Sequence, residues 1–301
     1  PLPKSKSKSH YPVVRSTPIS SGAAANTLVD MARNLSVSNR RLYRFGRNYN
    51  VKVDVRHDYA GAPIEVFALR DDWAVQKAFQ MAYQVYLDNT MDERENLSTT
   101  QVARWEDFRV APGLSLAINQ SRPVLHQVSG GASVLNAGEF ELSTVIDGTD
   151  TRRTFTWGTP AATEWGILQE YDKAGNAPTL PTDTVGSIGQ RGPYSGIDAD
   201  TDDLMALDLQ QHGDNPPYDR TGVNATTPWV RIAVLGGTAG TQKLSSGFFN
   251  APCGLVLLKG FSETSEAYSV EVEAKAGDYK GVHAPSMIEV ATVNRKRKVV
   301  Q

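Results

Sequence analysis

Short runs of alternating apolar and polar residues, separated by Gly, Pro, Asn and Asp, occur along most of this chain and predict a protein built from β-strands. The clearest run is 50–56, Asn-Val-Lys-Val-Asp-Val-Arg, whose strict alternation is typical of a strand with one buried face. Residues 64–69 predict a neighbouring strand after a Gly-Ala-Pro turn. Further strands are expected at 108–110, 114–118, 139–146, 151–157, 229–235, 253–261 and 268–275. The continuously apolar run 254–258 predicts burial on both faces.

One segment has a strong helical pattern. Apolar residues recur at helical spacing from Val75 to Tyr86, Asp71 or Asp72 can cap the first turn, and the pattern ends near Asn89. This predicts one amphipathic helix in the first third of the chain.

Two weaker helices are expected. One covers 99–107, where Ser98 and Gln101 have capping-box spacing. The other is a short helix near 27–35, within the Pro-, Ser-, Ala- and Asn-rich segment 12–39, which is otherwise interpreted as a linker.

About nine strand-like runs with few helices predict an all-β protein. We expect a single eight-stranded jelly-roll sandwich with one or two inserted helices and long surface loops, because 301 residues exceed an immunoglobulin domain of about 100 residues. No internal repeat of about 20–50 residues is visible, which argues against propellers and solenoids. Residues 172–228 contain six prolines and predict a long surface excursion.

The net charge of −2 hides a strong asymmetry along the chain. Residues 1–56 carry 11 Lys and Arg side chains against two acidic ones, whereas residues 57–294 carry 16 against 31. We therefore divide the chain into a basic, partly disordered N-terminal arm (1–47), a sandwich domain (48–294) and a basic C-terminal tail (295–301). Basic ends on an acidic body are typical of a protein that meets a polyanion with one surface.

Two basic clusters lie in the arm. Lys4, Lys6 and Lys8 alternate with serines in a segment with almost no apolar residues, so we expect it to be mobile. The second cluster is interleaved with Leu, Tyr and Phe residues that can anchor the backbone or stack on bases, and it consists of Arg40, Arg41, Arg44 and Arg47. The alternative is that both clusters are ordinary solvated surface.

The sequence contains no motif for catalysis. The five histidines are dispersed, and no G-x-S-x-G, Walker or H-E-x-x-H motif occurs. The single cysteine, Cys253, excludes an intramolecular disulfide and, beside an apolar run, is interpreted as a core residue rather than a nucleophile. We therefore expect no enzymatic activity.

A structural calcium ion is the one candidate cofactor. Asp198, Asp200 and Asp202 alternate in a loop, so their carboxylates can converge on a hard cation. The spacing is not that of an EF-hand, because Asp203 stands where the turn glycine of that loop belongs. A solvated acidic loop without metal is the alternative.

We expect no membrane partner. No stretch approaches the roughly 20 apolar residues of a membrane span, and the first residues lack the apolar core of a secretory signal. The composition predicts a soluble protein.

Four phrases give the chain a family resemblance. They are Asn-Arg-Arg-Leu-Tyr-Arg-Phe-Gly at 39–46, Asp-Asn-Pro-Pro-Tyr-Asp at 214–219, Ala-Pro-Cys-Gly-Leu-Val at 251–256, and Gly-Asp-Tyr-Lys-Gly-Val-His-Ala-Pro at 277–285. Together with the basic arm and the strand count, they resemble capsid proteins of small eukaryotic viruses with circular single-stranded DNA genomes. The likeness spans most of 39–287, although the arm is shorter and less basic than expected of a genome-binding arm.

The resemblance implies a viral capsid protein that self-assembles as a homo-oligomer into an icosahedral shell, in sixty copies or a multiple of sixty. Each copy would keep its arm inside on the genome and its long loops outside. The protein would reside in the virion, and in the host nucleus or cytoplasm during assembly; nothing indicates the host receptor. The residues implied to neutralise phosphates, without sequence preference, are Lys4, Lys6, Lys8, Arg15, Arg40, Arg41, Arg44 and Arg47.

Two alternatives share the predicted architecture. A capsid protein of a positive-strand RNA virus would differ only in the nucleic acid that it packages. A non-viral carbohydrate-binding or hydrolase β-sandwich would place Trp157, Trp165 and Trp229 on a ligand-facing surface and would not need a basic arm.

Overall fold

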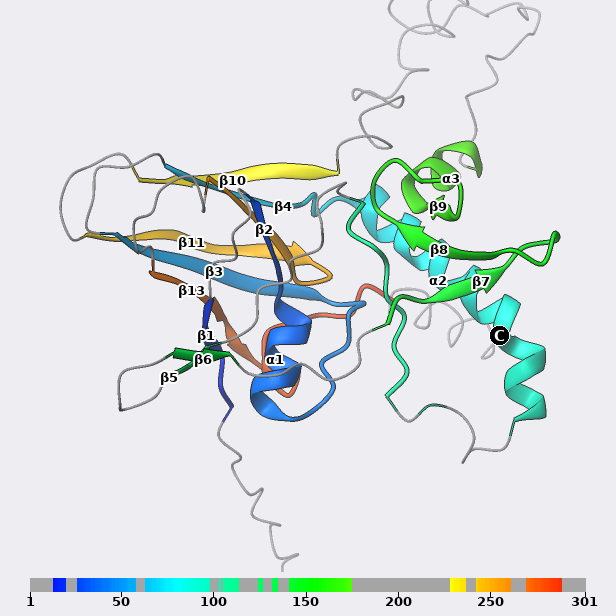
Figure 1. Cartoon of the computed structure of the whole chain (residues 1–301), viewed down its shortest axis with the longest axis horizontal. Coiled ribbons are helices and arrows are strands. Elements are labelled where there is room, and N and C mark those ends of the chain that lie inside the picture. Colours follow the sequence, from blue (N-terminus) through cyan, green and yellow to red (C-terminus); the bar gives the residue numbers. More distant parts are fainter. Residues whose placement is uncertain are drawn as a thin grey trace, which may run out of the picture.

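The computed structural model describes residues 13–19, 26–57, 63–97, 103, 105–113, 124–126, 132–134, 141–174, 228–236, 242–260 and 269–288. Most of its regular structure is β-sheet, and nearly all strand pairs are antiparallel. Figure 1 shows two four-stranded sheets at one end of the molecule and a part with two helices and a smaller sheet at the other. None of the described helices is long and apolar enough to cross a membrane.

Eight strands form the two large sheets. The first sheet has the order β1 (Ser16–Ile19), β13 (Ser269–Ala274), β3 (Asn48–His57), β11 (Gln242–Pro252). The second has the order β10 (Trp229–Leu235), β4 (Ile64–Leu69), β12 (Leu255–Lys259), β2 (Asn26–Asp30). The pairing is nested along the chain, because β4 pairs with β10, β3 with β11, β2 with β12 and β1 with β13, all antiparallel.

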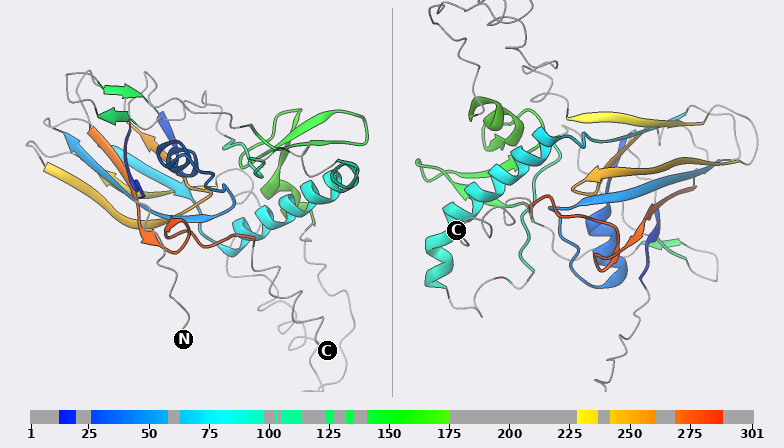
Figure 2. Two further views of the ribbon diagram at one scale, coloured as in Figure 1. Left: turned by 90° about the horizontal axis from the view of Figure 1, so that it is seen from below. Right: turned by 180° about the vertical axis from the view of Figure 1, so that it is seen from behind.

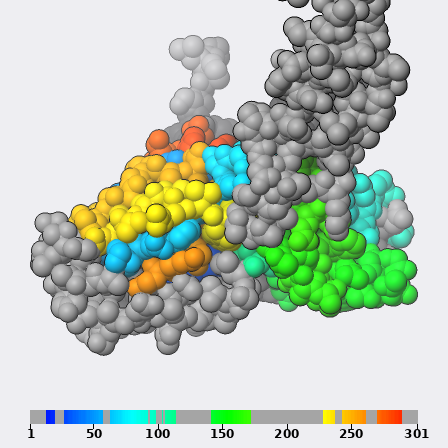
Figure 3. Space-filling view, turned by 90° about the horizontal axis from the view of Figure 1, so that it is seen from above, coloured from blue at the N-terminus to red at the C-terminus, as the bar shows by residue number. Residues whose placement is uncertain are grey.

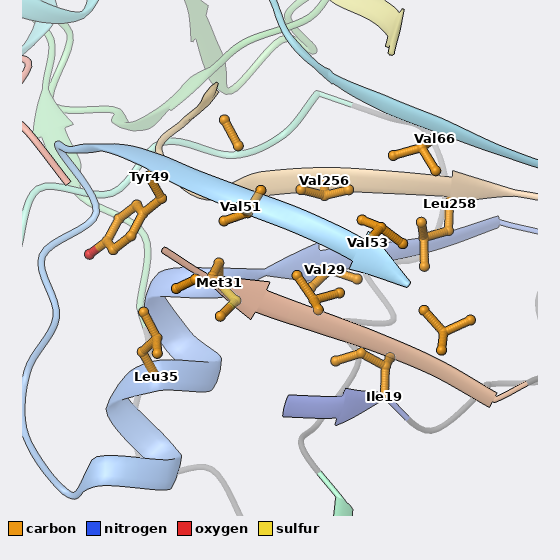
Figure 4. Packing of buried hydrophobic residues seen from close by; sticks show 14 of the residues in the cluster. Ile19, Val29, Met31, Leu35, Tyr49, Val51, Val53, Val66, Val256 and Leu258 are labelled. Atoms are coloured by element: carbon orange, nitrogen blue, oxygen red, sulfur yellow. The ribbon is translucent and has the colours of Figure 1, made fainter. Parts of the chain in front are cut away.

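An apolar core fills the space between these sheets, as Figure 4 shows. Every second residue of β3 is fully buried in it, namely Val51, Val53 and Val55. The second sheet contributes Val256 and Leu258 from β12, and each such side chain stabilises the fold by about 1.5–3 kcal/mol. The predicted alternation at 50–56 and the predicted burial of 254–258 on both faces are confirmed.

Three helices are described: α1 (Met31–Asn39), which overlaps the short helix expected near 27–35, α2 (Trp73–Asn96), and α3 (Ile167–Ala174), which was not expected. The Val75 N–H donates to Asp72 Oδ1 at 2.8 Å, so a predicted cap of α2 is confirmed. Beside α2 and α3 lies a sheet of β7 (Thr144–Ile146), β8 (Arg152–Thr156) and β9 (Glu164–Gly166), as both views of Figure 2 show. These elements share a second core around Phe79, Phe108, Phe155 and Trp157.

Two further strand pairs are small. They are β5 (Val124–His126) with β6 (Ala132–Val134) and β14 (Ala276–Gly277) with β15 (Gly281–Val282).

The interpretation of 12–39 as a linker is wrong, and the packed domain does not begin at residue 48. This segment contains β1, β2 and α1, and its Ile19, Val29 and Leu35 belong to the main core. Pro18 gives β1 the composition of a loop, but β1 is an edge strand, where proline is tolerated. Residues 1–12 and 289–301 lie outside the described residues, so the mobile arm and the basic tail stay predictions.

Strand β11 was not predicted, because a bulge interrupts its alternation of apolar and polar residues. Leu244, Phe249 and Ala251 face the core opposite Val55, Val51 and Tyr49, but the register shifts between Ser245 and Phe248. Leu244 and Phe249 are five positions apart, whereas Phe249 and Ala251 are two apart. A regular strand, in which every second residue faces inward, does not give this spacing.

Three further predictions near α2 are wrong. The helix does not end near Asn89 but continues to Asn96, since Arg94 pairs with Glu106 and the Asn89 side chain bonds the Ile146 backbone. Residues 105–107 do not form the helix predicted at 99–107, and residues 108–110 do not form the predicted strand. Residues 114–118 and 175–227 lie outside the described part of the chain.

A buried ion group connects these parts. Asp30, at the end of β2, accepts from the Arg33 N–H and so caps α1, while its other oxygen lies 3.3 Å from Arg109 Nη2. Arg109 Nε lies 4.0 Å from Asp107 Oδ2. All three side chains are at most 7% exposed. Removing one partner would therefore leave a charge uncompensated in the interior.

We predict that Arg109→Met lowers the free energy of unfolding by about 3–5 kcal/mol, because it leaves two buried carboxylates without their cation. The measurement is urea unfolding followed by tryptophan fluorescence. The matched control is Arg231→Met, whose partner Glu65 lies 2.8 Å away in an exposed pair, and its loss should stay within about 1 kcal/mol. Equal losses in the two variants would contradict the structural role of Arg109.

Candidate nucleic-acid interface

The arginine loop, residues 40–47, leads from the end of α1 to the start of β3. Arg40 caps the C-terminal end of α1 in the left-handed conformation with φ 49°, and the Arg41 N–H donates to Ser36 O at 3.3 Å. The Ser36 hydroxyl then accepts from the Tyr43 N–H at 2.9 Å. The helix terminus therefore fixes the first half of the loop.

Alternate residues of the loop point in opposite directions. Tyr43 and Phe45 are buried, whereas the side chain of Arg44 between them is 58% exposed. The Phe45 N–H donates to Asp107 Oδ2 at 2.7 Å, which ties the loop to the buried ion group. Of the two roles considered for the interleaved aromatic residues, Tyr43 and Phe45 have the anchoring one.

The hairpin of β14 and β15 completes this surface. The Tyr43 hydroxyl donates to Lys280 O at 3.0 Å, and the Tyr279 hydroxyl accepts from the Arg44 N–H at 3.0 Å. The Arg47 guanidinium lies 3.5 Å from the centre of the Tyr279 ring. We call Arg41, Arg44, Arg47 and Lys280 the cation cluster.

Mutual repulsion in the cation cluster is visible at Lys280. Burial lowers the pKa of its amine, and repulsion from Arg41, Arg44 and Arg47 lowers the pKa further. Asp107 Oδ1 lies 3.5 Å from Arg44 and offsets part of the charge. A bound anion would relieve this repulsion.

The structure brings together only part of the predicted set. Arg41, Arg44 and Arg47 lie in the cluster, and Arg40 is exposed at the end of α1. Arg47 also donates to Ala284 O at 2.7 Å and is half-buried, so it has a structural role as well. Arg15 lies just before β1, where its carbonyl accepts from the Ala274 N–H. The residues outside the described part of the chain are Lys4, Lys6, Lys8, Asp198, Asp200 and Asp202.

The sequence analysis missed Tyr279 and Lys280 as partners of the arginine loop. They lie more than 230 residues away in sequence, and the pairing of β13 with β3 helps bring their hairpin to the loop. The quoted phrase 277–285 is the one signal that could have directed attention to them.

Other candidate chemistry finds little support among the described residues. They contain no group of three or more His, Cys, Asp or Glu side chains that could hold a metal ion. Cys253 is fully buried, as predicted, and burial raises the pKa of its thiol well above the usual value. Trp157 is also fully buried and stacks on Phe79 at 6.0 Å, so it does not face a ligand.

A comparison of the chain with known protein families, curated proteins and solved structures finds no match.

We predict that the amine of Lys280 reacts faster with an acylating reagent near pH 8 than that of Lys77, an exposed lysine on α2. The lowered pKa leaves more of the Lys280 amine in its neutral, nucleophilic form. A single-stranded oligonucleotide should slow this labelling, because phosphate raises the pKa and covers the amine. Peptide mass spectrometry measures the labelling rates of both lysines. Equal rates for Lys280 and Lys77, unchanged when the oligonucleotide is added, would argue against an anion site here.

Proposed function

We propose that this chain is a viral capsid protein whose copies self-assemble into an icosahedral shell around a single-stranded DNA genome. In this proposal the chain is not an enzyme, its partners are further copies of itself and the genome, and it resides in the virion. The proposal has three supports, which are the strand pairing, the cation cluster and the exposed sheet edges.

The nested pairing of eight strands carries the proposal. A jelly roll is a long antiparallel hairpin of eight strands rolled over itself into two facing sheets. The pairs β4 with β10, β3 with β11, β2 with β12 and β1 with β13 have the order that such rolling produces. We therefore propose a single jelly-roll sandwich, an architecture found in viral capsid domains.

The cation cluster supports packaging of a nucleic acid. Its three arginines lie on a loop whose backbone is anchored by the buried Tyr43 and Phe45, so little backbone conformational entropy is lost when they meet phosphates. Arginine binds phosphate through a planar fork of donors, and this contact carries no sequence information. These properties suit a protein that neutralises any stretch of a single strand.

Exposed sheet edges support self-assembly. Within the described residues, no strand pairs with the outer edges of β10 and β11. Apolar side chains lie exposed there, namely Val230, Ile232 and Val234 on β10 and Phe248 on β11. Figure 3 shows β10 (yellow) bare on this face between β11 and β4. Such an edge invites pairing or packing with another chain, and a second copy would cover it.

The test is electron microscopy of purified, nuclease-treated protein, with the ratio of absorbance at 260 and 280 nm measured on the same sample. We expect uniform closed shells that protect a nucleic acid, and digestion of the extracted nucleic acid with DNase but not with RNase. Digestion by RNase alone would show that the packaged nucleic acid is RNA and would overturn the DNA part of the proposal. A monodisperse monomer without nucleic acid at all salt concentrations would overturn the proposal.

A matched pair of variants tests the sheet edge. Ile232 is 38% exposed on β10 and Leu142 is 37% exposed outside the two large sheets. Ile232→Lys should abolish or sharply reduce shell formation, because it places a charge in the subunit contact, whereas Leu142→Lys should still assemble.

We predict that Arg44→Ala weakens binding of a single-stranded oligonucleotide and reduces the slope of log Kd against log salt concentration by about 0.7, as the loss of one phosphate contact does. Fluorescence anisotropy over a salt series measures both quantities. Arg231→Ala is the control, since Arg231 is also 58% exposed and also faces a carboxylate. An unchanged slope for Arg44→Ala would remove Arg44 from the interface.

A further inference from the structure

A pocket of about 300 Å³ lies beside the arginine loop. The loop, helix α2, residues 106–108 and residues 286–288 surround it. Its volume is at the lower end of the range of roughly 300–1,000 Å³ for small-molecule sites. It suits a ligand of the size of one nucleotide.

One wall of the pocket is aromatic and aliphatic. Tyr83 and Tyr86 of α2 lie with their ring centres 5.4 Å and 5.2 Å from that of Phe108. Leu87 and Ile288 extend this wall. Such a wall can pack against a flat, weakly polar group.

The acidic groups of the pocket already have partners. Glu106 pairs with Arg94 through both carboxylate oxygens and accepts from the Tyr86 hydroxyl at 2.6 Å. Burial and, to a smaller extent, the hydrogen bond to Glu106 raise the pKa of Tyr86 to about 12. Its hydroxyl therefore stays protonated and keeps donating to Glu106. Arg94 and Glu106 therefore offer the ligand no net charge.

Arg44 supplies the positive charge at the pocket. Its contacts are long, 3.5 Å to Asp107 Oδ1 and 3.4 Å to Glu106 O, and its side chain is 58% exposed. Arg44 can therefore turn toward an anion without breaking a short hydrogen bond. Arg47 also lines the pocket and adds positive potential.

We propose that this pocket holds one unstacked nucleotide of the bound strand, with the base against Tyr83 and the phosphate on Arg44. The proposal rests on the proposed function and adds a defined contact to it. An aromatic wall beside a guanidinium matches the two halves of a nucleotide, since bases stack on aromatic rings and phosphates pair with arginine. A duplex keeps its bases stacked, so the site selects single strands.

The test is photocrosslinking of the full chain to a single-stranded oligonucleotide that contains 5-iododeoxyuridine, followed by trypsin digestion and mass spectrometry. Tyr83 and Tyr86 both lie in the tryptic peptide 78–94. We expect adducts on this peptide, and competition by unlabelled single strand but not by duplex or inorganic phosphate.

Two variants on α2 separate filling of the pocket from general damage. Leu87→Trp fills the pocket and should reduce the adduct on 78–94 at least about fivefold, which is the smallest effect expected from losing one stacked base. Val85→Trp makes the same change at a position that is 48% exposed, and it should leave the adduct unchanged. Arg44→Ala should also reduce the adduct without changing the fold.

The outcomes distinguish the pocket from the proposed function. Adducts confined to other peptides, or equal yields from Leu87→Trp and the unmodified chain, would overturn the nucleotide pocket and leave the capsid proposal standing. An oligonucleotide that does not bind at all would overturn both.

Discussion

The buried group of Asp30, Arg109 and Asp107 is the interaction on which the rest of the structure depends. It joins Asp30, which ends β2 and caps α1, to Asp107 and Arg109 in the chain that follows α2, almost 80 residues later. A charge in the interior is costly without a partner, so any arrangement that separated these segments would leave a buried charge uncompensated. Asp107 also receives the Phe45 N–H, and the arginine loop therefore takes its position from the same group.

In the arginine loop, buried aromatic residues alternate with exposed basic residues, so the loop presents a charged surface above the buried ion group. Tyr43 and Phe45 fill the interior, so Arg44 must point outward, and the hairpin at 276–282 adds Tyr279 and Lys280. The same arginine also lines the pocket beside α2. In the proposed function, this one loop would contribute both a general electrostatic surface for phosphate and a more specific nucleotide site beside it.

The spacing and polarity of neighbouring residues predicted those elements whose structure depends mainly on nearby sequence. The strict alternation of β3, the bounds of β4 and β10, the cap at Asp72 and the burial of Cys253 all follow from spacing and polarity. Strands β1 and β11 could not be predicted from local pattern, because each depends on contacts with residues distant in sequence. Pro18 is tolerated in β1 because this strand lies at a sheet edge, and the bulge in β11 depends on its pairing with β3. For the site, composition identified Arg41, Arg44 and Arg47, but Lys280 and Asp107 join them only through the tertiary structure.

A reconstruction by electron cryomicroscopy of the purified, nucleic-acid-containing particle would test the account most directly. We predict that Arg41, Arg44 and Lys280 line the inner wall of the shell and that density for a nucleic acid lies against them. A particle in which these residues face the outer surface, with the nucleic acid held elsewhere, would contradict the account.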